Sequence, residues 1–316
     1  QCTLRAAIEE SNARSGPNRI TADAAYRITL QSDLPSIASN VELIGPLTID
    51  ATGAQGPALV VERDDTRLEG LRITGGQSHG LELRARTQID DARIRGNGSC
   101  GTPAGGVFAR GAIRLSDAEV SNNGGPGLVS QGTLRLFNVT LAENAGDGAI
   151  AESEGFVRTR FTLEGDVSIR DNQGHGLAAY PGGITMGAGS LEVTGNCGWG
   201  LWSELDAIRL NPGPSVVRDN GKTVAGQGSG SFWSIDSGTP VGRSEVCGGG
   251  GLSTTGLQPA PREANVFVLT ATVSDNQGPG IASTARVQLF DVLVAANSGP
   301  GVLVAEDEGT SRETTV

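Results

Sequence analysis

Hydrophobic and polar positions along this chain follow a short phrase that recurs down most of its length. The phrase has an apolar residue, two variable residues, asparagine, and then Gly-x-Gly followed by another apolar residue. Clear copies stand at 120–128 (VSNNGGPGL), 169–177 (IRDNQGHGL), 193–201 (VTGNCGWGL), 273–281 (VSDNQGPGI) and 294–302 (VAANSGPGV). Alternating apolar residues on both sides of glycine-rich turns predict short β-strands.

The phrase repeats with a drifting period. Successive phrase asparagines are 26, 21, 28, 24, 24, 56 and 21 residues apart. A period in the low twenties with glycine turns is typical of a stacked β-solenoid, in which each coil buries its apolar side against its neighbours about 4.8 Å away. A sandwich or propeller would instead favour hairpin dipeptides and periods of about 40 residues. We therefore predict an all-β, right-handed parallel β-helix of roughly ten rungs.

Two kinds of inward position follow from this fold. Side chains alternate along a strand, so the apolar residue after the second glycine and the residue two positions later should both point inward. Asparagine at a fixed turn position should form an internal ladder, whose amides bond to one another and to turn backbone. The predicted ladder residues are Asn97, Asn123, Asn144, Asn172, Asn196, Asn220, Asn276 and Asn297.

A second column of Asp and Asn stands six residues before the ladder asparagine. Its members could form an acidic or metal-binding row, or a second turn in which their side chains bond to local backbone N–H groups. We favour the turn. The members are Asp91, Asp117, Asn138, Asp166 and Asp291.

The chain begins with an amphipathic segment, CTLRAAIEESNAR, which Gly16-Pro17 ends. A helix here should cap the open first rung. No comparable helix is predicted at the other end, so we expect either a longer protein or contact between the last rung and a partner. The predicted parts are a capping helix at 1–18, β-helix rungs at 19–220, an insertion or degenerate rungs at 221–265, further rungs at 266–305 and a tail at 306–316.

The composition and charge of the chain limit the kinds of partner that it is expected to bind. The 316 residues carry a net charge of −11, and no apolar run is long enough to cross a bilayer. Negative charge disfavours nucleic acid and anionic membranes. It also mildly disfavours anionic polysaccharides, unless Ca²⁺ or a local arginine cluster offsets the repulsion. We expect no cofactor, and no motif indicates a Ca²⁺ site.

The four cysteines are Cys2, Cys100, Cys197 and Cys247, and they form neither a CxxC motif nor a pairing with histidine. Zinc is therefore not expected, nor any other metal. Cys197 lies in a ladder turn and Cys247 in a glycine-rich stretch, so a disulfide between them could attach the 221–265 segment to the rod. Such a bridge would indicate an oxidising compartment, whereas Cys100 could be a free thiol.

Candidate chemistry lies on one outward face of neighbouring rungs. Aligned outward positions give an aromatic patch flanked by carboxylates, an arrangement on which sugar rings can stack. Trp233 in the 221–265 segment could overhang this patch. Alternatively, Trp199 and Trp202 pack beneath the 221–265 segment as a small second core. The predicted ligand-binding residues are Asp147, His175, Tyr180, Trp199, Trp202 and Glu204.

An enzyme of the same fold is the main alternative. Carboxylates on adjacent rungs lie at distances that suit glycoside cleavage, and Glu152, His175, Tyr180 and Glu204 would form its groove. The sequence Gly174-His175-Gly176 matches the GHG of polygalacturonases. Their NTD and RIK motifs are missing, however, and the middle position varies between repeats, so we interpret the match as a coincidence of the repeat.

The opening residues carry a family resemblance. CTLRAAIEESNARSGPNRI, followed by ITLQSDLPSIASNVELIGP and LTIDATG, resembles the start of bacterial CSLREA-type surface and secreted parallel β-helix proteins, a group that includes proteins similar to polymorphic outer-membrane proteins. The later repeats resemble the pectin-lyase-like superfamily. The resemblance implies export, surface display and a cysteine partner for Cys2 that would precede Gln1, but no particular reaction.

These observations predict an exported extracellular or cell-surface β-helix with a structural, adhesin-like role, which contacts carbohydrate through residues 175–204. The rival hypotheses are a polysaccharide lyase or glycoside hydrolase, and a building block that stacks end to end through its last rung.

Overall fold

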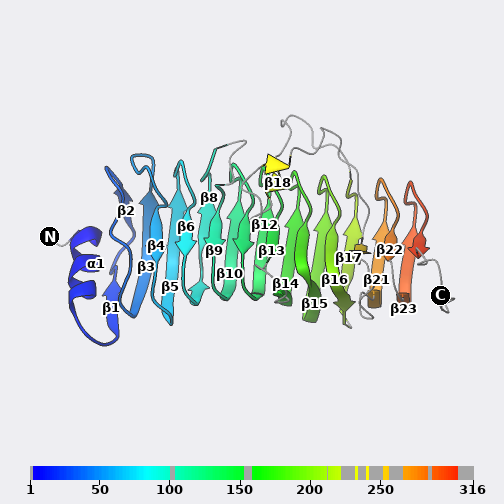
Figure 1. Cartoon of the computed structure of the whole chain (residues 1–316), viewed down its shortest axis with the longest axis horizontal. Coiled ribbons are helices and arrows are strands. Elements are labelled where there is room, and N and C mark those ends of the chain that lie inside the picture. Colours follow the sequence, from blue (N-terminus) through cyan, green and yellow to red (C-terminus); the bar gives the residue numbers. More distant parts are fainter. Residues whose placement is uncertain are drawn as a thin grey trace.

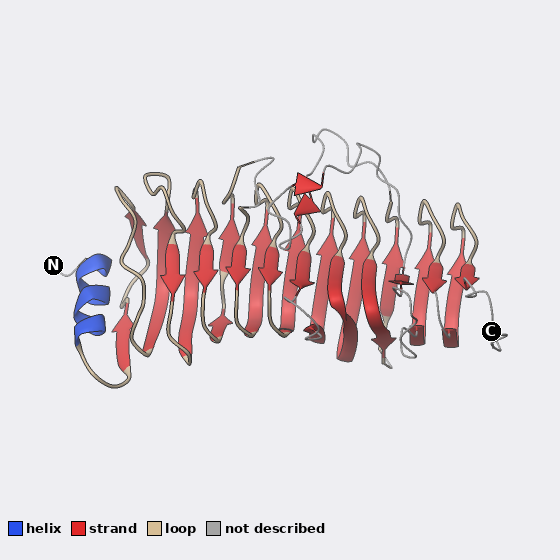
Figure 2. Ribbon diagram, in the orientation of Figure 1, coloured by secondary structure: helices blue, strands red, loops and turns tan. Residues whose placement is uncertain are grey.

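The chain folds into a parallel β-solenoid of about nine turns, preceded by one short helix, as the sequence predicted (Figure 1). The structure is a computed structural model and describes residues 3–99, 104–152, 159–211, 213–221, 232–233, 240–241, 252–255, 266–283 and 287–304. Strands of successive coils stand side by side along the rod, with the single helix at one end and the last described coil at the other (Figure 2).

Helix α1 (Leu4–Ala13) covers the first coil. Its N-cap is Thr3, whose hydroxyl accepts a hydrogen bond from the Ala6 N–H, and its buried residues include Ile8. Arg5 and Asn12 bond to loop backbone of the coil beneath. Asn12 accepts from the Ala38 N–H at 2.9 Å through its Oδ1. The helix therefore closes the apolar end of the stack, as expected from its amphipathic pattern.

A typical coil has a short strand, a corner, a long strand with a bend in its middle, and the Asn-Gly turn. The first coil contributes β1 (Asn18–Thr21) and β2 (Tyr26–Thr29). The short strands are β4 (Leu59–Val61), β6 (Leu81–Leu83), β9 (Val107–Ala109), β11 (Leu128–Ser130), β13 (Ala149–Glu152), β20 (Leu252–Thr255), β22 (Ile281–Ser283) and β24 (Val302–Val304).

The long strands pair in parallel from coil to coil. The bend divides the long strand into β7 (Thr87–Asp90) and β8 (Arg93–Arg95) in one coil, and in another it separates β16 (Leu201–Leu210) from β17 (Ser215–Arg218). Strand β15 (Leu177–Thr194) joins a short strand and a long one without a break, and β16 joins a short strand to the first part of a long one. The other long strands are β3 (Val41–Asp50), β5 (Thr66–Thr74), β10 (Ile113–Ser121), β12 (Leu134–Ala142), β14 (Thr159–Arg170), β21 (Val266–Ser274) and β23 (Val287–Ala295).

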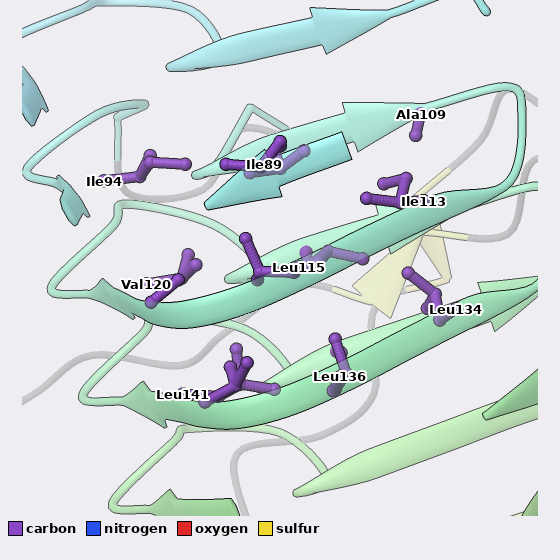
Figure 3. Packing of buried hydrophobic residues seen from close by; sticks show 14 of the residues in the cluster. Ile89, Ile94, Ala109, Ile113, Leu115, Val120, Leu134, Leu136 and Leu141 are labelled. Atoms are coloured by element: carbon purple, nitrogen blue, oxygen red, sulfur yellow. The ribbon is translucent and has the colours of Figure 1, made fainter. Parts of the chain in front are cut away.

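The core consists of columns of aliphatic side chains. Ile89, Leu115 and Leu136 occupy the same register position on three successive coils, and each is at most 1% exposed (Figure 3). Parallel in-register pairing places like side chains above one another about 4.8 Å apart. Each coil therefore completes the burial of the next, which is why the fold requires the sequence to repeat.

The phrase asparagines form one continuous ladder from Asn97 to Asn297. From Asn123 onward, the side-chain oxygen of each accepts from both the backbone N–H and the amide group of the asparagine one coil earlier, whereas Asn97 accepts from the Gly76 N–H. At Asn172 these two bonds, from Asn144, are 3.1 and 2.9 Å long. The Asn172 amide in turn donates to Asn196 at 2.9 Å and to the Leu141 carbonyl at 3.1 Å. The ladder thus satisfies buried backbone groups that the tight turn leaves without strand partners.

The ladder runs directly across the 56-residue interval. Asn220 donates to Asn276 from its backbone and from its amide, at 3.0 and 3.1 Å. Strand β17 pairs with β21, and β20 lies between β16 and β22. The interval is therefore a single step of the stack that carries a long excursion. Within it, β18 (Phe232–Trp233) and β19 (Pro240–Val241) form an antiparallel pair outside the main sheet.

The bend in the long strand explains the second Asp and Asn column. Asp91, Asp117, Asn138 and Asp291 have positive φ angles between 44° and 53°, a conformation that Asp and Asn tolerate better than most residues. In the coil of Asp166, the neighbouring Gly165 takes this conformation instead. The Asn138 amide donates to Asp117 at 2.9 Å, so the column is a bend with its own partly formed ladder.

The last described coil is more exposed than the others. Val302 and Val304 occupy inward positions but are only half-buried, whereas the equivalent Leu128 and Ser130 have no exposed surface. Contact between this end and another chain stays a prediction. None of the helices in the described part has the length and apolar character to cross a membrane.

Candidate functional site

The predicted aromatic face forms at the start of β15 and β16. The phrase turns deliver His175 and Trp199 just before the two strands, and the parallel register sets Ala178 opposite Trp202. The Trp202 ring lies 4.1 Å from the Tyr180 ring, centroid to centroid, at an interplanar angle of 51°, and it stacks on the His175 ring at 5.7 Å and 10°. Three of the predicted rings are thus one packed group.

A chain of hydrogen bonds through the phrase turns holds this group. The Asp147 carboxylate accepts from the backbone N–H of His175, and the Nδ1 atom of His175 accepts from the backbone N–H of Trp199 at 2.8 Å. Nδ1 can accept only when it carries no proton, so this geometry corresponds to a neutral imidazole with its proton on Nε2. The two side chains therefore provide acceptors for the backbone N–H groups of His175 and Trp199, which are not bonded by the pairing between coils.

Burial differs from the expectation for two of these residues. Asp147 and His175 were expected on an exposed outward face, but Asp147 is 1% exposed and His175 is 6% exposed. The physical reason is the hydrogen bonding just described, which draws both side chains against the next turn. Asp147 cannot contact a polysaccharide from this position, and the accessible part of the face is Tyr180, Trp199 and Trp202, each half-buried.

An apolar outward row continues from this group along the short strands. Val129, Ile150 and Ala178 occupy successive positions of the row, lie outside the core cluster, and are nevertheless buried. Side chains outside the core therefore cover them. This burial agrees with the alternative hypothesis that Trp199 and Trp202 pack in a small second core. The Trp202 side chain is nevertheless only half-buried. The row begins at Phe108 and ends at Trp202.

The far end of the row repeats the histidine arrangement, which the sequence reasoning missed. His79 holds the turn position equivalent to His175, accepts from the Gly105 N–H through Nδ1 at 3.1 Å, and stacks on Phe108 at 5.3 Å. Burial lowers the pKa of His79. The available signal was a shared position in the repeat, because Phe108 and Trp202 each stand two residues after the second glycine of the repeat that follows the histidine. The chain has two histidines, and both have this structural role.

The remaining predicted residues are spread over the same strands. Glu152 is half-buried and lies opposite Tyr180 in the register. Glu204 ends the β16–β20 pairing, and its side chain lies outside the described residues, as does that of Trp233. Cys197 is disulfide-bonded, but Cys2, Cys100 and Cys247 lie outside the described residues. The bridge from Cys197 to Cys247 stays a prediction.

A metal site would require several ligand side chains close together. Within the described ranges, no three or more His, Cys, Asp or Glu side chains gather closely enough to hold a metal ion. In particular, the Asp and Asn column points its side chains to neighbouring bends, where Asn138 accepts from the Asp166 N–H at 3.0 Å.

Comparison with known proteins adds no family to this description. A scan of the sequence against protein-family models gives no match. A search against curated proteins likewise finds no relative. The parallel β-solenoid is thus the level at which the chain can be classified.

Proposed function

We propose that this chain is a rigid rod with a structural, adhesin-like role on the surface of a bacterial cell or outside it. The observation that carries the proposal is the unbroken asparagine ladder, which joins eight asparagines into one hydrogen-bonded column. A column of this kind resists bending and slippage between coils. The CTLRAAIEESNAR resemblance supports export and membership of the CSLREA-type β-helix group, and the later repeats support a pectin-lyase-like fold.

Carbohydrate is the partner that we propose for the rod. Tyr180, Trp199 and Trp202 are half-buried, so their rings are fixed by packing while part of each stays accessible. Fixed aromatic rings lose little conformational entropy when a sugar stacks on them. We prefer binding to catalysis because His175, a residue of the enzyme hypothesis, uses Nδ1 to hold the Trp199 turn.

The test is a panel of neutral and acidic polysaccharides, scored for retention and for cleavage products. Trp202→Ala should weaken retention about tenfold, since an aromatic contact contributes about 1.5 kcal/mol. Phe108→Ala is the matched control, because Phe108 also stacks on a histidine at the equivalent position of another coil. Thermal unfolding of both variants separates lost binding from lost folding.

Three outcomes would count against the proposal. Equal losses in Trp202→Ala and Phe108→Ala would indicate a general effect of surface aromatics. Retention of no polysaccharide would leave the face a packing feature. Cleavage products that disappear in Glu204→Gln would make the protein an enzyme. Protease accessibility on intact cells tests the surface location separately.

A further inference from the structure

A groove of about 530 Å³ lies on the surface of the rod, where the short strands lead into β5, β7, β10 and β12, in the N-terminal half of the chain. Among the residues that the structure describes, four arginines line it, against one carboxylate, that of Asp65. In a chain of net charge −11 this is a local reversal of sign. We call it the arginine groove, and its arginines are Arg67, Arg86, Arg114 and Arg135.

Three of these arginines stand in one row along the rod. Arg67 pairs with Gln88, Gln88 with Arg114, and Arg114 with Arg135, on four successive coils. Since neighbouring coils are about 4.8 Å apart, the row runs parallel to the rod axis over roughly 14 Å. Charges in such a row suit an extended ligand better than a single small anion.

Two of the four groove arginines form ion pairs with carboxylates, and two do not. Arg67 forms ion pairs with Glu69 at 2.9 Å and with Asp90 at 3.1 Å, and Arg86 pairs with Asp65. Arg114 and Arg135 are exposed, directly opposite one another, and in the described part of the chain neither has an ion pair or a side-chain hydrogen bond. Like charges directly opposite each other destabilise a sheet, so a bound anion would relieve a real repulsion.

We propose that the arginine groove binds a linear anionic polysaccharide. Guanidinium groups pair bidentately with carboxylate or sulfate groups, and the coil spacing is close to the length of one sugar residue. Gln88 and Thr133, which also line the groove, can hydrogen-bond to sugar hydroxyls. The inference rests on the proposed glycan-binding role and names a ligand class for it, but it uses a surface separate from the aromatic face.

Single-stranded nucleic acid is the other extended polyanion to weigh. Proteins that bind it stack bases on aromatic side chains, whereas none of the described residues that line the groove is aromatic. A long, densely charged strand would also meet the negative remainder of the rod. A polysaccharide with charges on some of its sugars avoids both difficulties.

The experiment measures retention of the purified chain by dextran sulfate, a polyuronate and neutral dextran, which separates sulfate from carboxylate recognition. The test variant is Arg114→Gln with Arg135→Gln. Its matched control is Arg209→Gln, because Arg209 is exposed on the same outward row, three coils beyond Arg135 and outside the groove. The native chain should be retained by a charged polymer and not by neutral dextran.

We expect the double variant to lose at least about tenfold in affinity, while the Arg209 variant and Trp202→Ala keep theirs. Thermal unfolding should show no loss of stability in the double variant, because a repulsion is removed. If it nevertheless fails to fold, Arg114→Lys with Arg135→Lys keeps the charge and removes the bidentate fork, and should bind severalfold more weakly.

The proposal is overturned if no charged polymer is retained, if Arg209→Gln loses as much as the double variant, or if neither double variant weakens binding. Retention of single-stranded DNA as tightly as the polysaccharide, through the same arginines, would overturn the ligand class. Loss with Trp202→Ala alone would place binding on the aromatic face, which would uphold the proposed function and reject the groove.

Discussion

The central asparagine of the ladder offers the sharpest test of how the rod is held together. Asn172→Ala removes a side chain with no exposed surface that makes four side-chain hydrogen bonds. Two donors then lose their acceptor, the backbone N–H and the amide of Asn144. The Leu141 carbonyl and Asn196 Oδ1 each lose one donor, and Asn196 Oδ1 keeps the backbone N–H of residue 172 at 3.1 Å. The damage is therefore concentrated on Asn144.

The expected loss in the free energy of unfolding follows from these lost hydrogen bonds. A buried polar group left without a partner costs about 1–3 kcal/mol, so two orphaned donors should cost about 2–6 kcal/mol. Asn297 provides the matched comparison, since it accepts the same two bonds from Asn276 at 3.1 and 2.8 Å but is half-buried. There water can replace the lost acceptor, and Asn297→Ala should cost about 1 kcal/mol.

Urea unfolding of the two variants, monitored by circular dichroism, measures the difference in the free energy of unfolding. Solenoids need not unfold in one step, so amide hydrogen exchange at Asn144 supplies a local measurement. We expect its protection to fall in Asn172→Ala and to stay unchanged in Asn297→Ala. If the two variants cost the same, or if the Asn144 amide stays protected, the ladder is not the interaction that holds the coils together.

Three further predictions test other parts of the fold. Asp91→Val should cost about 1–2 kcal/mol in thermal unfolding because Asp91 has a φ of 44°, whereas Asp91→Gly should be close to neutral; equal losses would contradict this reason. Gly105→Ala should cost about 1–3 kcal/mol, since the new Cβ would lie 1.9 Å from the Pro126 carbonyl oxygen; an unchanged melting temperature would refute it. Folding lowers the pKa of His79, so the unfolded state binds more protons, and the free energy of unfolding should fall as the pH drops below about 6.5. The fall should be smaller in His79→Gln, and identical pH profiles of the two proteins would contradict this reason.

The repeat determined how much of the fold could be predicted. Inward positions are constrained in every coil, so the asparagine and the residue after the second glycine recur visibly, and both the ladder and the core columns follow from them. Leu128, Leu177 and Leu201 are fully buried, as predicted. The 56-residue interval was ambiguous because the count of residues does not distinguish two coils from one coil with an excursion. The Asn220–Asn276 bonds and the pairing of β17 with β21 show that it is one coil.

The site was harder to predict because outward positions carry no repeat. Alternation placed His175 and Trp202 on the same face, where their rings stack, but it cannot indicate that N–H groups of the next turn will hold and bury Asp147 and His175. The unpaired arginines were missed although a signal existed. Arg114 and Arg135 each stand nine residues before a ladder asparagine, Asn123 and Asn144. Numbering every residue from its ladder asparagine would have placed them side by side.

The net charge of a solenoid is a poor guide to the charge of the ligand that one part of it binds. In a compact domain the field at one site includes charges from all around it, but in a solenoid most of the chain lies several coils away. Screening at physiological salt acts over about 8 Å, less than two coil spacings. The field at Arg114 and Arg135 therefore comes from their own and neighbouring coils, where Arg67 and Arg86 are paired with carboxylates. Within the described residues Arg114 and Arg135 have no ion pair, so their charge is not neutralised. An acidic solenoid can thus present a basic groove, and its ligand has to be inferred coil by coil.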